Sequence, residues 1–267
     1  MGITKEIQNI TYQNLIQNSI MAAVHFLALY SIISWNASYP LALVILAYSL
    51  RLFFVAAGNH RYFSHKSFIL NRFFQFIFGL GSTLAMHNSI FWWASKHRKH
   101  HKYINHEDDP HSHKKGFYWS HIGWILDDDN QIDLITIKDL TEHKELNFLS
   151  NNHKLINISF AILLFLILGF KSFCSIYCLS LVLSWTTMFF VNSLGHKIGY
   201  QNHQIKDDST NIPGFALISF GEGLHNNHHR NPYQPNNRVK WFEIDLTYIA
   251  LYILSLIKIV KFRKKVS

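Results

Sequence analysis

The sequence predicts an all-α protein that crosses a membrane several times, and two observations support that prediction. Of the 267 residues, 49% are hydrophobic and only 15% are charged, whereas an average soluble domain has roughly 25% charged residues. The hydrophobic residues gather in four blocks, each near the roughly 20 residues that a membrane-crossing helix needs. The predicted membrane helices cover residues 16–35, 39–58, 155–170 and 173–191.

The four predicted membrane helices pair into two hairpins. Only a short turn at residues 36–38, followed by Pro40, separates the first helix from the second. Trp35 and Tyr39 flank this turn, and aromatic residues of this kind favour the membrane–water interface. Lys171 and Ser172 separate the third helix from the fourth, which predicts a second tight turn.

Two hairpins return the chain twice to its starting side, so residues 59–154 and 192–267 are predicted to form one helical cap on the side of the N-terminus. Of the 25 Lys and Arg residues, only Lys171 falls in the two turns and Arg51 within a span, whereas Lys5 and the remaining 22 lie on the common side. The positive-inside rule makes that side cytoplasmic. We therefore expect an integral, multi-pass membrane protein with both termini in the cytoplasm. The net charge of +9 is scattered along the chain, which argues against a nucleic-acid partner.

The sequence also allows predictions for three further stretches of the cap. Residues 73–94 are apolar, but a membrane crossing there would place two histidine clusters on opposite sides, so we expect a helix in the interface or against the other helices. Residues 247–265 resemble an amphipathic helix with a basic end, suited either to anionic lipid headgroups or to ordinary docking. Residues 125–154 are polar and are expected to form an irregular connector.

Histidines cluster after the predicted membrane helices. Two clusters have the spacing i, i+3, i+4, which places three imidazoles on one helical face. Neutral imidazole is the commonest protein metal ligand, and a metal with four or five ligands would use only half of the set. The chain, residues 1–267, is therefore predicted to be one domain in which distant clusters converge on more than one metal. The set is His60, His65, His97, His100, His101, His196, His225, His228 and His229.

The first pair of histidines is irregular. His60 and His65 are five residues apart, about 140° around an α-helix, so they cannot share a face of a straight one. Either the helix ends between them, near residues 58 and 59, or the two rings reach the metals from different sides. Asn192 and His196, by contrast, are four apart and share a face. Ordinary structural roles are expected for the other histidines: His25, His87, His106, His111, His113, His121, His143, His153 and His203.

The spacing argues against two known plans for a metal site. Di-iron carboxylate bundles use the Glu-x-x-His motif twice, and only Glu222 and His225 have that spacing here. The His-Glu-x-x-His motif of metalloproteases is absent from the sequence. Imidazole suits zinc, copper, iron and nickel alike, so the residues alone leave the metal open.

Several of these motifs together resemble the membrane-bound acyl-CoA and acyl-lipid delta-9 fatty acid desaturases, the stearoyl-CoA desaturase type. The resemblance runs in the right order over roughly residues 40–250 and implies four membrane helices under a cytoplasmic cap. The stretches that carry it are residues 59–65, 93–102, 109–111, 120–124, 192–196 and 221–229.

The resemblance also implies a di-iron centre. By position, one iron would take His60, His65, His97, His101 and His229. The other would take His100, His196, His225 and His228, with Asn192 acting through a water. Glu222, Asp109 and His121 would orient ligand rings through hydrogen bonds, or would act as structural caps.

The implied reaction is oxygen-dependent desaturation, which removes two hydrogens from adjacent methylenes of a saturated acyl chain and leaves a cis double bond, at the delta-9 position. An unactivated methylene has no acidic proton, so an oxidising metal must start the reaction. The acyl chain must lie in a narrow apolar tunnel, with Trp93, Trp185, Met188 and Phe189 as candidate lining residues. The rivals are a membrane di-iron fatty acid hydroxylase or oxygenase and a non-catalytic metal-binding or transport protein. A transporter would place polar ligands near the midplane of its spans.

The acyl carrier stays open between CoA and lipid. Ser95 and Lys96 stand where animal acyl-CoA enzymes carry Arg-Asp, whereas Lys114 and Lys115 stand where that family has a basic pair. Lys96, Lys114 and Lys115 are therefore candidate phosphate contacts. The chain lacks a His-Pro-Gly-Gly haem-binding motif, so we expect a separate electron donor, such as ferredoxin or a b-type cytochrome with its reductase, beside O2 and the lipid bilayer.

Overall fold

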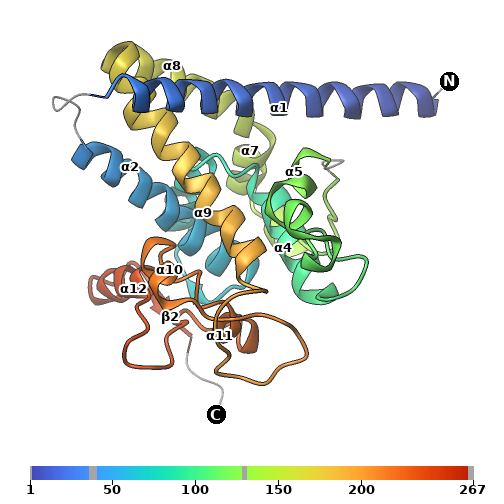
Figure 1. Cartoon of the computed structure of the whole chain (residues 1–267), viewed down its shortest axis with the longest axis vertical. Coiled ribbons are helices and arrows are strands. Elements are labelled where there is room, and N and C mark those ends of the chain that lie inside the picture. The colour runs from blue at the N-terminus through green and yellow to red at the C-terminus, as the bar shows by residue number, and fades with distance from the viewer. Residues whose placement is uncertain (1, 36–40, 128–130, 264–267) are drawn as a thin grey trace.

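The computed structural model describes residues 2–35, 41–127 and 131–263, with side chains described from residue 14 onward. This part of the chain is mostly helical (Figure 1). It holds three helices that are long and apolar enough to cross a membrane, which are Asn14–Ile33, Leu41–Ser64 and His153–Leu194. An integral membrane protein is the class that these helices indicate.

The long helices are composed of shorter elements. They are α1 (Gly2–Ile33), α2 (Leu41–Phe53) with the π-helix η1 (Phe54–Ser64), and α8 (His153–Ser172) with the π-helix η4 (Phe173–Leu179) and α9 (Ser180–Leu194). The other helices are α3 (Arg72–Leu84), α4 (Ile90–Tyr103), η2 (His113–Lys115), η3 (Trp119–Gly123), α5 (Trp124–Leu126), α6 (Lys138–Thr141), α7 (Lys144–Asn151), α10 (Pro213–Ile218), α11 (His225–Arg230) and α12 (Leu246–Leu256).

The longest apolar helix doubles back on itself. Gly169 has φ 71° and ψ 168°, a backbone conformation that glycine adopts without steric cost. The two arms then pack side by side, with ring centroids 5.6 Å apart for Phe165 and Phe173 and 6.3 Å apart for Phe160 and Tyr177. The predicted second turn is therefore present, but the chain reverses at Gly169 rather than at Lys171 and Ser172. The predicted first turn, residues 36–38, lies outside the described residues.

Two other predictions need correction. The apolar stretch 73–94 is not one helix, because α3 ends at Leu84 and the Ser89 hydroxyl caps the start of α4 by accepting a hydrogen bond from the Trp92 N–H (3.1 Å). α3 does pack against other helices, chiefly η1 and α7. The residues between 125 and 154 include two short helices, α6 and α7, rather than only irregular backbone.

The C-terminal region also differs from the predicted single helix over residues 247–265. α12 ends at Leu256, and the chain then forms β2 (Lys261–Phe262), which pairs antiparallel with β1 (Phe68–Ile69). This small sheet also means that the fold is mostly helical rather than purely α-helical. Pairing with β1 satisfies backbone groups that a longer helix would have satisfied internally.

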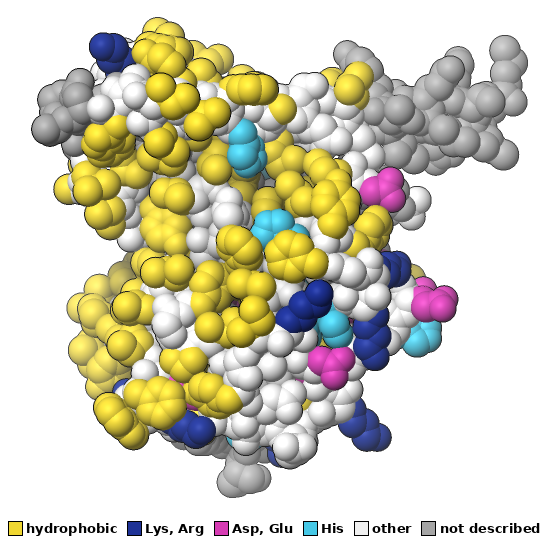
Figure 2. Space-filling view, in the orientation of Figure 1, with side chains coloured by type: hydrophobic (Ala, Val, Ile, Leu, Met, Phe, Trp, Pro, Cys, Tyr) yellow, Lys and Arg dark blue, Asp and Glu magenta, His cyan; other side chains and the backbone are white. Residues whose placement is uncertain are grey.

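The spatial order of the elements places the histidine-bearing segments together. In Figure 1, α1 lies across one end of the molecule, α2 and α9 run away from it, and α10, α11 and α12 lie at the opposite end. Figure 2 shows hydrophobic side chains over α2 and α9 and around α10 and α12, whereas most of the charged side chains on this face lie toward α4 and α5. A buried core of Phe63, Phe78, Phe91, Leu146 and Leu149 holds η1, α3, α4 and α7 together.

Candidate metal centre and acyl cavity

η1 supplies His60, and His65 caps its C-terminal end; this geometry overturns one sequence prediction. In a π-helix the N–H of residue i+5 donates to the carbonyl of residue i, and the His65 N–H donates to the His60 carbonyl at 3.2 Å. Residues five apart therefore lie one turn apart, and the two ring centroids are 5.0 Å from each other. The prediction that the helix ends near residues 58 and 59 is wrong, because the helix changes type and continues to Ser64. The argument that these rings cannot share a face holds for a straight α-helix and does not apply to a π-helix.

α4 supplies three histidines and divides them between two groups. His97 and His101 lie one turn apart, with their Nε2 atoms 3.1 Å from each other. His100 is rotated away from them, since each helical residue turns by about 100°, and it joins a second set of rings.

The remaining histidines come from η1 and its C-cap, from the turn just after α9 and from α11. We call His60, His65, His97, His101 and His228 the first histidine group. The second histidine group is His100, His196, His225 and His229. The resemblance had implied His229 in the first set and His228 in the second. In the structure these two histidines are exchanged, with His228 in the first group and His229 in the second. The exchange follows from α11, on which adjacent residues point in different directions.

The ring nitrogens of each group converge on one point. In the first group the Nε2–Nε2 distances are 2.9 Å for His60 and His228, 2.8 Å for His65 and His97, and 3.0 Å for His101 and His228. In the second group, His196 and His225 are 3.1 Å apart. Nitrogens at roughly 2.0–2.1 Å from one ion and at right angles to each other lie about 3 Å apart. The spacing therefore fits ligands around a metal ion.

Unpartnered nitrogens support the same conclusion. The Nε2 atoms of His100 and His229 are buried and have no hydrogen-bond partner, and a buried polar atom without a partner is costly unless something binds it. The two groups also touch, since the ring centroids of His101 and His229 are 4.7 Å apart. The described residues can thus hold two metal ions side by side.

Three carboxylates fix the orientation of ligand rings. Asp109 lies 2.9 Å from His100 Nδ1, Asp207 lies 3.0 Å from His229 Nδ1, and Glu222 contacts His60 Nδ1. A carboxylate that accepts the Nδ1–H leaves Nε2 as a bare lone pair aimed at the metal. The sequence had suggested Glu222 and Asp109 for such contacts but not Asp207, which reaches His229 only through the folding of the loop after α9.

Glu222 also belongs to a buried ion-pair network. Arg61 Nη2 donates to Glu222 Oε1 at 3.0 Å, and Arg61 Nη1 donates to the two oxygens of Asp245 at 3.0 and 2.8 Å. The three side chains are at most 2% exposed. Asp245 in turn caps α12 by accepting from the Tyr248 N–H at 2.9 Å. The network therefore links the start of α12 to the ring of His60.

Burial keeps the clustered histidines neutral, which is the form that binds metals. Desolvation and the neighbouring imidazoles lower their pKa well below the ordinary value of 6.5. This statement covers His65, His97, His100, His101, His196, His225, His228 and His229. Burial alone would raise the pKa of Glu222, but His60 and Arg61 lower it overall, so Glu222 stays ionised beside them.

His111 joins the site although the sequence suggested only an ordinary structural role. Its ring centroid lies 4.1 Å from that of His100, its Nδ1 has no partner, and burial lowers its pKa to about 3. The sequence signal that could have pointed to His111 is the motif Asp109-Pro110, which comes directly before it. His121 lies elsewhere, with its Nδ1 3.0 Å from the Ser193 hydroxyl.

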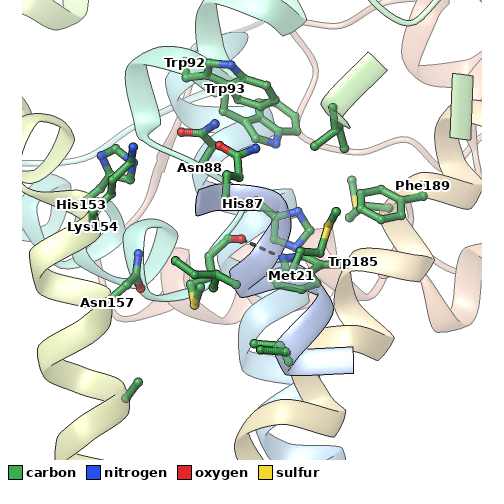
Figure 3. A pocket seen from close by; sticks show the side chains of 18 of the residues that line it. Met21, His87, Asn88, Trp92, Trp93, His153, Lys154, Asn157, Trp185 and Phe189 are labelled. Carbon is green, nitrogen blue, oxygen red and sulfur yellow. Dashed lines mark hydrogen bonds between the residues drawn. The ribbon is translucent and has the colours of Figure 1, made fainter. Parts of the chain in front are cut away.

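An apolar cavity of about 460 Å³ adjoins the first histidine group, a volume in the usual range for small-ligand sites. Its lining runs from Cys178 at the end of η4 to Asn192 of α9, a rise of about 21 Å. Trp93, which stacks on His97 with centroids 4.7 Å apart, forms part of the wall beside the ligands. The four residues suggested for an acyl tunnel all line this cavity, namely Trp93, Trp185, Met188 and Phe189. Figure 3 shows Trp185 and Phe189 across the cavity from His153, Lys154 and Asn157.

The candidate phosphate contacts do not lie together on the cavity. Lys96 lines it, whereas Lys114 and Lys115 are exposed on η2 and are not part of its lining. Lys115 lies over the ring of Trp119, 5.3 Å from its centroid. Ser95 is buried and accepts a hydrogen bond from the Asp133 N–H (2.9 Å), so it packs the cap.

Comparisons with known proteins agree with this site. The family model described as "Fatty acid desaturase" matches residues 34–248. The sn-1 stearoyl-lipid 9-desaturase of Synechocystis sp. is 38% identical over 210 residues, which cover 78% of this chain and 66% of that protein. The sn-2 palmitoyl-lipid 9-desaturase of Nostoc sp. is 34% identical over 245 residues, 89% and 85% of the two chains. The icosanoyl-CoA 5-desaturase of Limnanthes douglasii is 30% identical over 250 residues, 91% and 70% of the two chains.

Proposed function

Because this chain belongs to the fatty acid desaturase family, an oxidoreductase family, we propose that its histidine groups hold two iron ions and that it introduces a cis delta-9 double bond into saturated acyl chains. The observation that carries the proposal is the meeting of two convergent, buried histidine groups with an apolar cavity beside Trp93 and His97. The delta-9 position rests on two relatives named 9-desaturases, whereas the plant relative is named a 5-desaturase.

The iron pair, when bound and reduced, would activate O2, which is the oxidant that removal of unactivated hydrogens requires. The overall reaction consumes O2, two electrons and two protons and releases two waters with the alkene. A separate donor must therefore deliver two electrons per turnover. Asn192, which lines the cavity near the end of α9, would act on the second iron through a water.

The protein residues determine which methylenes react. The wall of the cavity is rigid where Trp185 Nε1 donates to the Met86 carbonyl at 2.8 Å. Met188 and Phe189, at 8% and 6% exposure, close the same wall. Because the methylenes of the acyl chain are chemically alike, the depth at which the chain stops in this cavity sets the position of the double bond.

We infer that the three apolar helices make four crossings, since His153–Leu194 folds back at Gly169, and that the cap and both termini are cytoplasmic. Reporter fusions after residue 37 and after residue 267 should report opposite compartments. The same compartment for both would contradict the four-crossing topology.

The reaction is tested by expression in a host whose own desaturase has been removed, followed by mass spectrometry of total fatty acids with location of the double bond. We expect a new delta-9 mono-ene and about two irons per chain by elemental analysis. The His97→Ala variant should lose both product and part of the iron. The control is His143→Ala, because His143 lies at the surface beside Arg72.

The alternative functions predict different products. A hydroxy acid in place of the mono-ene would favour the oxygenase. An unchanged fatty acid profile, with iron loaded and an electron donor supplied, would refute the desaturase proposal and leave a metal-binding protein.

A further inference from the structure

Among the residues that the structure describes, the exposed part of the cavity wall lies on α1 and α8. Most of the residues that line the cavity are buried or half-buried. Within the described part of the chain, the lining residues that are exposed all belong to α1 or α8: Ile16, Ile20, Ala23, Lys154 and Ile158. A residue that both lines a cavity and faces outward marks its mouth, so the mouth lies between α1 and α8.

These two helices meet at one end and separate toward the other. Near their hairpin ends, the rings of Tyr30 and Phe170 are in contact, with centroids 5.3 Å apart. Farther along, α1 packs mainly on η4 rather than on α8, and Gln17 of α1 and Asn157 of α8 both line the cavity. The opening is thus a wedge between two helices that are long and apolar enough to cross a membrane.

The rim of this wedge is apolar over most of its length. Ile16, Ile20 and Ile158 are 41%, 42% and 52% exposed, which is costly in water but favourable in the acyl region of a bilayer. Lys154, by contrast, stands at the first turn of α8, where the apolar segment begins. A lysine at the end of a membrane helix extends its ammonium group to the headgroup level, and no ion pair with a carboxylate is found for Lys154 among the described residues.

We propose that the substrate enters sideways from the bilayer, through the wedge between α1 and α8, as an acyl chain still esterified to a phosphate-bearing glycerolipid, with Lys154 beside the lipid phosphate. This inference rests on the proposed function and adds the carrier and the route. An acyl-CoA carries a large polar group that cannot lie among apolar side chains at membrane depth, so a mouth rimmed by isoleucines suits a lipid and not a thioester of CoA. Lys114 and Lys115 do not line the cavity, and Lys96 lines it but is not among its exposed residues, so these three candidate phosphate contacts do not gather at this mouth.

Entry is tested by photolabelling, which needs no turnover. The whole protein is reconstituted in nanodiscs with phosphatidylglycerol that carries a diazirine near the middle of one acyl chain, and adducts are mapped by mass spectrometry. We expect adducts on Met188 and Phe189, which are buried in the cavity wall. A bulky residue at the rim should close the wedge, so Ile158→Trp should lower these adducts roughly tenfold.

Two controls separate entry from general damage. Leu155→Trp introduces the same residue on the same helix at a position that is 64% exposed but does not line the cavity, and it should leave the adducts unchanged. Lys154→Glu should lower labelling by phosphatidylglycerol several-fold, whereas Lys144→Glu, on the exposed surface of α7, should not.

The outcomes distinguish the route from the reaction. Equal loss of adducts in Ile158→Trp and Leu155→Trp, or labelling of the cavity by a diazirine acyl-CoA but not by the lipid, would overturn sideways entry and leave desaturation standing. Cavity labelling by the lipid in a protein that yields no mono-ene in the host would support the route and overturn desaturation.

Discussion

Replacing Glu222 by Gln should weaken metal binding more than it weakens the fold. Glu222 accepts from both His60 Nδ1 and Arg61 Nη2, and Gln keeps the shape of the side chain but removes its charge. Loss of a carboxylate partner behind a ligand histidine typically costs 10–100-fold in metal affinity, about 1.4–2.7 kcal/mol. Arg61 would still be neutralised by Asp245, so the metal-free protein should remain folded.

Asp245→Asn is the matched control, because it disturbs the same arginine without touching a histidine. Asp245 makes two contacts to Arg61 and also accepts from the Asn237 and Tyr248 N–H groups at 2.8 and 2.9 Å. Breaking one side of a buried ion pair costs about 3–5 kcal/mol. This variant should therefore lose more stability than Glu222→Gln while its metal affinity stays within about threefold of the parent protein.

The assay measures two quantities on detergent-purified protein. Metal affinity is obtained by competition with a chelator, and stability of the metal-free protein by a thermal or denaturant midpoint. Glu222→Gln should shift the first quantity more and Asp245→Asn the second. Equal losses of metal affinity in the two variants would refute a ring-orienting role for Glu222 and assign the network to stability alone.

Three further predictions concern the pH dependence of stability, the packing around a glycine and the role of His111 in metal binding. Burial lowers the pKa of the clustered histidines, so the unfolded chain takes up more protons than the folded one as the pH falls below about 6.5. The free energy of unfolding of the metal-free protein should therefore be full above that pH and fall below it. Equal denaturation midpoints at pH 8 and pH 5 would contradict this prediction. Gly223→Ala should lower the free energy of unfolding by about 1–3 kcal/mol, since the added Cβ would lie 2.7 Å from the Ala216 backbone nitrogen. Gly214→Ala is the control, because its Cβ would have nothing within 4 Å. Its thermal denaturation midpoint should change little. His111→Ala should weaken metal binding about tenfold or more, and a competition titration indistinguishable from that of His143→Ala would exclude His111 from the site.

Local spacing allowed most ligand residues to be chosen from the sequence. A histidine triplet spaced i, i+3, i+4 is recognisable because helix geometry depends only on neighbours. The same local reasoning failed at His60 and His65, where the chain adopts a π-helix. The division of His228 and His229, which rested on the resemblance, was exchanged because it depends on how α11 is rotated against η1 and α4. Neither feature follows from the spacing of residues within one segment.

Contacts between distant segments were beyond the reach of sequence spacing. Asp207 reaches His229 across a loop, and Arg61 meets Asp245 across 184 positions of the chain. His111 joins His100 through the turn that follows α4. Each of these contacts depends on a long-range approach that packing enforces, and polar residues in loops carry no periodic signal that would reveal it.

The sequence by itself determined which segments form long apolar helices and where histidine clusters stand along them, because hydropathy and helical periodicity are properties of contiguous residues. The tertiary structure decided how the nine imidazoles divide, which carboxylates hold them and where the cavity opens. The reason is physical: coordination and cavity shape depend on the positions of atoms from α1, η1, α4, α8, α9 and α11 to within fractions of an ångström, and those positions are set only when the helices pack together.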